Sequence, residues 1–189
     1  MLTPISLLWL PAFVATLFVF LGGFVVNMLL PHHRSDWSKL SDEDDLREAI
    51  RSQDLERGQY TFPHAASTAE AQTEAHQKRV DEGPNGFLII GPNEVGPSVR
   101  QLVLHYVHVA FISIFVAYVC SAAIPVGADY LKVFQVAGTA ALLAYAGSVF
   151  ALSIWYHFAW AYTWRRAADG LFYALLTAGA FGWLWPMVG

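Results

Sequence analysis

Five of the seven histidines lie in or beside long apolar stretches of the sequence: His32, His33, His105, His108 and His157. Neutral imidazole is a common ligand of zinc, copper and iron, and two histidines on separate helices can hold a haem from opposite faces. All five are therefore candidate ligands of a transition metal. His105, His108 and His157 are also the candidate ligands of a cofactor such as haem.

The spacing of these histidines matches no established metal-binding motif, so three interpretations stay open. The rings could be interfacial side chains without a ligand, since imidazole suits a zone that is wet on one side and apolar on the other. They could bind a metal or haem, with an acidic residue such as Asp36 joining from the loop. They could also relay protons, because ionisable groups in membrane helices are functional candidates. The first interpretation is the preferred one.

The elements that must position these residues are four apolar stretches, each long enough to cross a bilayer: 5–30, 101–124, 133–162 and 170–188. The fold class predicted is an all-α bundle of four transmembrane helices. Four spans place both termini on one side and the segment 31–100 on the other. All five histidines then fall at the loop-side membrane face.

The segment 31–100 is predicted to form a small polar domain between the first two spans. Capping residues predict short helices at about 41–52 and 67–80. Residues 60–62 and Gly86–Ile90 have strand composition. The second segment could pair with the first or lie as an apolar flap on the membrane surface.

Composition excludes several functional classes. Only five of the 26 charged residues (11 Lys and Arg, 15 Asp and Glu) lie outside 31–100, and the net charge of −4 leaves no basic patch for nucleic acid. No acid or base lies near the middle of a span, and no catalytic motif is present, so neither an enzyme nor a coupled transporter is favoured. The lone Cys120 excludes an internal disulfide.

Small residues and charge bias predict how the spans associate and which way they face. Gly170, Ala174, Ala178 and Gly182 recur every four residues and would let an antiparallel third span approach closely, with 165–169 as the turn between the two. Such faces could also bind other membrane subunits or a second copy. Ten of the eleven Lys and Arg lie on the loop side, which predicts a cytoplasmic loop and periplasmic termini.

Four segments carry a resemblance to a known family: residues 30–36 (LPHHRSD), 58–63 (GQYTFP), 153–156 (SIWY) and 169–186 (DGLFYALLTAGAFGWLWP). With these segments the chain resembles a family of small four-span bacterial inner-membrane proteins with no known activity. The resemblance implies a bacterial inner-membrane location and transfers no site residues. The function expected is a non-catalytic accessory or scaffold subunit of a membrane assembly; the alternative is a haem- or metal-binding membrane protein.

Overall fold

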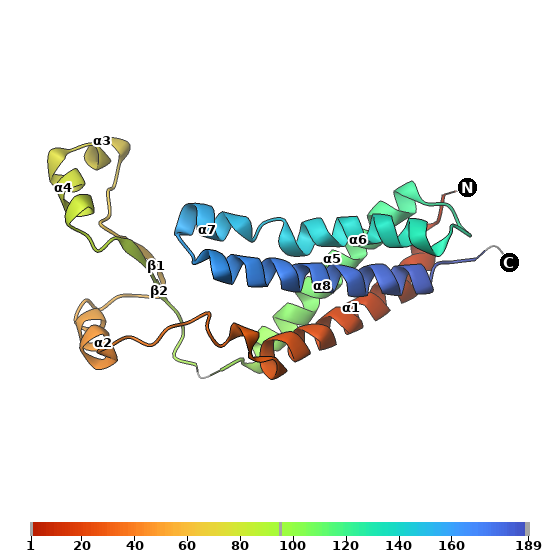
Figure 1. Ribbon diagram of the computed structural model, residues 1–189, viewed down its shortest axis with the longest axis horizontal. Coiled ribbons are helices and arrows are strands. Elements are labelled where there is room, and N and C mark those ends of the chain that lie inside the picture. The colour runs from red at the N-terminus through yellow and green to blue at the C-terminus, as the bar shows by residue number, and fades with distance from the viewer. Residues whose placement is uncertain (1, 95, 188–189) are drawn as a thin grey trace. The chain divides into compact units, whose positions relative to one another are not determined.

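The computed structural model describes residues 2–94 and 96–187, and it divides into two compact units. The first unit comprises residues 1–37 and 97–189 and contains the apolar helices, whereas the second, 38–96, contains the polar segment. The chain is mostly helical, as predicted (Figure 1).

In the described part of the first unit, three helices are long and apolar enough to cross a membrane, over Ile5–Leu29, Val99–Ala123 and Tyr130–Tyr156. The first consists of a 3₁₀ turn, helix α1 (Trp9–Phe24) and a π-helical segment, Val25–Leu29. Helix α5 (Val99–Ala123) begins at a capping box, in which Ser98 and Gln101 satisfy each other's backbone N–H groups. Helices α6 (Tyr130–Ala146) and α7 (Phe150–Tyr156) make up the third.

The expected third and fourth spans, 133–162 and 170–188, have different boundaries in the structure. The helix is interrupted at residues 147–149, and α7 ends where His157 takes a left-handed conformation, with φ of 57°. Helix α8 then runs without a break over Trp160–Trp183. The turn predicted at 165–169 is therefore wrong, because the charged residues there are paired with other charges and the helix continues through them.

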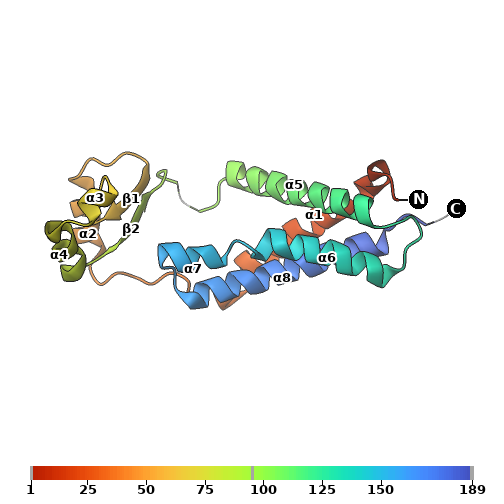
Figure 2. The ribbon, with the colours of Figure 1, turned by 90° about the horizontal axis from the view of Figure 1, so that it is seen from above.

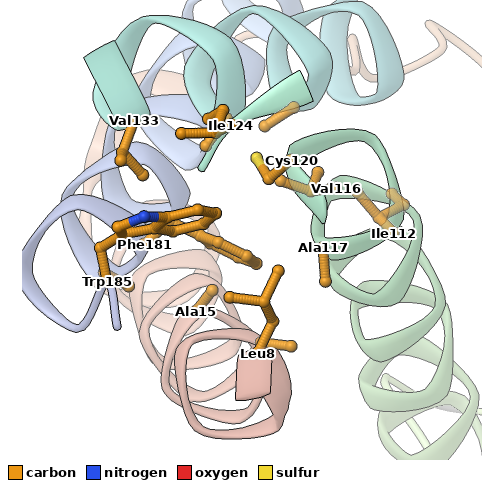
Figure 3. Packing of buried hydrophobic residues seen from close by; sticks show 14 of the residues in the cluster. Leu8, Ala15, Ile112, Val116, Ala117, Cys120, Ile124, Val133, Phe181 and Trp185 are labelled. Carbon is orange, nitrogen blue, oxygen red and sulfur yellow. The ribbon is translucent and has the colours of Figure 1, made fainter. Parts of the chain in front are cut away.

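Both ends of the described chain meet the α5–α6 connection at one end of the first unit (Figure 1). The Thr3 hydroxyl donates to the carbonyl of Ile124 at 2.9 Å, and the Trp185 indole N–H donates to the carbonyl of Pro125 at 3.0 Å. Beneath these bonds lies an apolar core in which Leu8, Cys120 and Phe181 are completely buried (Figure 3). We call this the terminal end of the helical unit, and the opposite end, where the chain leaves α1, the loop end.

The small residues of α8 pack against α6, which confirms the predicted antiparallel pair (Figure 2). A Cβ atom at Gly138 of α6 would lie only 3.1 Å from the Cβ of Ala178, and one at Gly170 would lie 2.8 Å from that of Ala146. Gly182 lies against the ring of Tyr130 in the same way. The small-residue face of α8 is thus covered within the chain.

In its described residues, the second unit contains a two-stranded antiparallel sheet and three short helices, two of which lie between the strands in sequence. Strands β1 (Gly58–Phe62) and β2 (Gly86–Ile90) pair antiparallel with Tyr60 opposite Leu88, so the expected pairing is confirmed. Helix α2 covers Glu43–Arg51. The helix predicted over 67–80 is two helices, α3 (Thr68–Ala71) and α4 (Glu74–Glu82), because the Thr73 hydroxyl accepts from the His76 N–H and starts a new helix.

Candidate functional site

His32 and His33 lie on a short 3₁₀ turn, Pro31–His33, directly after the first helix. Pro31 starts this turn and disfavours helical backbone at Leu30, which is extended with ψ of 141°. The chain therefore leaves α1 sharply, and the two imidazole rings lie 4.0 Å apart between centroids. Residues of α8 lie against the same turn.

Asp169 of α8 contacts both histidines with its two carboxylate oxygens. Nε2 of His32 lies 3.2 Å from Oδ1, and Nε2 of His33 lies 2.9 Å from Oδ2. The Asp169 side chain is only 7% exposed. Among the described residues, His32, His33 and Asp169 form a group whose three ligand atoms all lie within 4.8 Å of one another. We call this group the His–His–Asp cluster.

Asp36 holds the ring of His33 from its other side. Its Oδ2 lies 2.7 Å from Nδ1 of His33, and its Oδ1 lies 2.7 Å from Nε of Arg165, with the carboxylate 1% exposed. When Nδ1–H donates to this carboxylate, the lone pair of the neutral ring is on Nε2, which faces Asp169. Metal-binding histidines in proteins are commonly oriented in this way by a carboxylate at the second ring nitrogen.

Two atoms of the cluster are buried without a hydrogen-bond partner: Nε2 of His33 and Oδ2 of Asp169. They are close to each other, yet the ring nitrogen and the oxygen are not aligned for a hydrogen bond. A buried lone pair beside a buried carboxylate oxygen is unfavourable unless a proton or a metal cation lies between them. The donor set of two imidazole nitrogens and one carboxylate fits a divalent transition metal.

Arg166 lies at the edge of the cluster, 3.6 Å from Oδ2 of Asp169. Its guanidinium donates to Oδ1 of Asn27 at 2.8 Å and lies 5.3 Å from the ring centroid of Tyr162. The Asn27 amide in turn donates to the hydroxyl of Tyr173 at 3.1 Å. These contacts hold Arg166 beside Asp169. The positive charges of Arg165 and Arg166 thus offset the negative charges of Asp36 and Asp169.

Two interruptions of regular helix lie next to the cluster. Asn27 belongs to the π-helical segment at the end of the first helix, and such segments are frequent at functional sites. On the other side, a Cβ at Gly170 would lie 3.0 Å from the carbonyl oxygen of Tyr145, close to the interruption between α6 and α7.

The three remaining histidines lie elsewhere in the helical unit. Nε2 of His105 lies 3.5 Å from the position of a Cβ at Gly23, and its ring is 5.9 Å from that of Phe20, in the seam between α1 and α5. His108 is exposed on the same helix, and His157 is exposed at the turn before α8. Among the described residues, none of these three belongs to a group of close metal-ligand atoms.

The sequence suggested Asp36 as the acidic ligand and placed Asp169 in a turn. In the structure, Asp169 is the acidic member of the cluster. The sequence signal for it is the i, i+3 and i, i+4 spacing of Arg165, Arg166 and Asp169, which is typical of one charged helix face.

The fold and the site thus define a helical protein with apolar helices of membrane-spanning length and a histidine–carboxylate cluster at one end. Comparisons with protein-family models, with curated proteins and with solved structures find no match to the chain.

Proposed function

We propose that the protein is a membrane protein that binds one divalent transition-metal ion at the His–His–Asp cluster. The observation that carries this proposal is the set of three donor atoms within 4.8 Å of one another. Two of them, Nε2 of His33 and Oδ2 of Asp169, are buried 2.9 Å apart without a hydrogen bond between them. His32 Nε2 adds a third donor. Two imidazoles and one carboxylate leave coordination positions for water or a further ligand, as in open zinc and iron sites.

The same geometry favours a metal ion over haem at this place. A haem bound by two histidines requires imidazoles on opposite faces of the porphyrin plane. The rings of His32 and His33 are direct neighbours, 4.0 Å apart, and leave no room for a macrocycle between them. In the absence of a catalytic motif, we propose an accessory role for the metal-bound protein in the membrane rather than an enzymatic one.

For the membrane arrangement, we propose four spans in a bacterial inner membrane, with residues 31–100 in the cytoplasm. Helix α8 supports a fourth span because it packs antiparallel to α6, and its 24 residues would measure about 36 Å. The His–His–Asp cluster would lie at the cytoplasmic boundary, with the α7–α8 turn projecting beyond it. Exposed aromatic side chains near that turn, Trp155, Trp160 and Trp164, suit the headgroup layer.

Sidedness is tested with single cysteines at Glu70 and Asp129, each in a Cys120→Ser background. A membrane-impermeant maleimide applied to intact cells is expected to label the cysteine at position 129 and to leave that at position 70 unmodified until the cells are opened. The reverse labelling pattern would contradict the orientation, and labelling of both positions would contradict the proposed topology.

Metal binding is tested on detergent-purified protein by titration with Zn²⁺ and Co²⁺, with bound metal quantified by mass spectrometry. We expect one ion per chain, and at least a tenfold loss of affinity in both His33→Ala and Asp169→Asn, because each removes a donor to the ion. His108→Ala is the matched control: it removes a histidine of the same unit that lies outside the cluster and is expected to bind metal like the parent protein.

Equal metal binding by His33→Ala and the parent protein would overturn the proposal. A loss with His108→Ala but not with His33→Ala would instead favour a site formed by His105, His108 and His157. A protein that binds no metal at micromolar concentration would favour the accessory-subunit interpretation without a ligand.

A further inference from the structure

Helix α6 carries a polar stripe on its outward face, formed by Lys132, Gln135 and Thr139. All three residues are exposed, and their spacing of three and four places them on one side of the helix. Within the described part of the chain, none of their side chains makes a hydrogen bond or an ion pair. Asp129, the nearest acidic residue in sequence, makes no ion pair with Lys132 either.

The stripe lines a groove of about 550 Å³ along α6, which Val119 of α5 borders on one side; α5 and α6 are labelled in Figure 2. The groove is shallow and open along one side, so a ligand in it would remain exposed on its outer face. The rest of the lining is apolar: Val119 of α5 together with Val136, Ala140 and Leu143 of α6. The groove is separate from the His–His–Asp cluster and lies toward the terminal end of the unit.

A membrane environment makes the free stripe unfavourable. An amide or hydroxyl that faces hydrocarbon without a hydrogen-bond partner costs about 2–7 kcal/mol, depending on the reference state. Thr16 and Thr177 avoid this cost by donating to the carbonyl four residues earlier, whereas Thr139 does not. Hydrogen-bonding groups from another molecule would remove this cost.

The order of polarity along the groove identifies the kind of partner. The lining begins at the terminal end with the ammonium of Lys132. The amide of Gln135 lies about 4.5 Å farther along the helix axis than Lys132, and the hydroxyl of Thr139 lies about 10 Å farther than Lys132. Beyond Thr139 the lining is hydrocarbon. A phospholipid with an anionic headgroup has the same order: phosphate, glycerol esters and acyl chains.

We propose that this groove binds an anionic phospholipid of the leaflet at the terminal end. The Lys132 ammonium would pair with the phosphate, and Gln135 and Thr139 would hydrogen-bond to the glycerol-ester region. An acyl chain would lie along Val119, Val136 and Leu143. This inference rests on the membrane-spanning placement of α5 and α6 and is independent of the metal site.

The proposal is tested by thermal unfolding of the full chain in a neutral detergent, with phosphatidylglycerol or phosphatidylcholine added. Phosphatidylglycerol is expected to raise the Tm of the parent protein by about 2–4 °C more than phosphatidylcholine does. Lys132→Gln is expected to lose most of this difference and Lys132→Arg to keep it. Gln135→Leu should lose part of it. Lys78→Gln, which removes a lysine of the second unit, is the matched control and should behave like the parent.

An undiminished phosphatidylglycerol effect in Lys132→Gln would overturn the proposal. The proposal would also be overturned if the parent protein were a dimer in detergent, by its measured mass, and Gln135→Leu were a monomer. That result would assign the stripe to contact with a second copy, whose Gln135 could pair with this one across a twofold axis. All variants change exposed side chains, and their Tm values without added lipid report whether each still folds.

Discussion

Gly170→Ala is expected to lower the free energy of unfolding of the helical unit by about 1–3 kcal/mol. The new methyl group would lie 2.8 Å from the Cβ of Ala146 and 3.0 Å from the carbonyl oxygen of Tyr145. Neither neighbour is the far end of a flexible side chain, so α6 and α8 would have to separate. Unfolding in detergent, followed by circular dichroism, measures the change, and Gly170→Leu should have a larger effect.

Gly179→Ala provides the matched control on the same helix. A Cβ at Gly179 meets no atom within 4 Å, so this substitution adds a methyl group without a clash. Because alanine is the better helix former, the variant is expected to be unchanged or more stable by up to about 1 kcal/mol. Equal destabilisation by both substitutions would show that the α6–α8 contact does not depend on a small residue at position 170.

Asp36→Asn is expected to weaken metal binding at the His–His–Asp cluster by about 10–100-fold, although Asp36 is not one of the three ligands. The carboxylate accepts from His33 Nδ1 and neutralises Arg165, with both distances at 2.7 Å. The asparagine amide carries no charge, so it would orient the ring less firmly. It would also leave Arg165 unneutralised near the ion, which lowers the affinity for a cation further.

Competition between Zn²⁺ and a chromophoric chelator measures this loss. Asp44→Asn is the control, because the Asp44 side chain is 95% exposed in the second unit, where it pairs with Arg47. The Tm of both variants in the presence of a chelator separates an effect on the ion from an effect on folding. Unchanged affinity in Asp36→Asn would show that the carboxylate serves only to pair with Arg165.

Local sequence patterns anticipated much of the secondary structure correctly. The pairing of the two short strands follows from their composition and flanking turn residues. The antiparallel packing of α6 and α8 follows from their small residues, since only these allow close helix approach. The four-span topology, the sidedness and the bacterial inner-membrane location stay predictions.

By itself, the sequence determined which stretches are apolar helices, and it drew attention to His32 and His33. Only the tertiary structure decided which acidic group meets them. Hydropathy placed a turn at 165–169, because unpaired charges are unfavourable within a span. In the folded chain Arg165 is paired with Asp36, and Asp169 contacts both histidines and Arg166, so the helix passes through this segment and the turn lies at 157–159. The pairs of Asp36 with Arg165 and of the two histidines with Asp169 join residues more than 120 positions apart. Such pairing depends on how the helices pack, which no local pattern records.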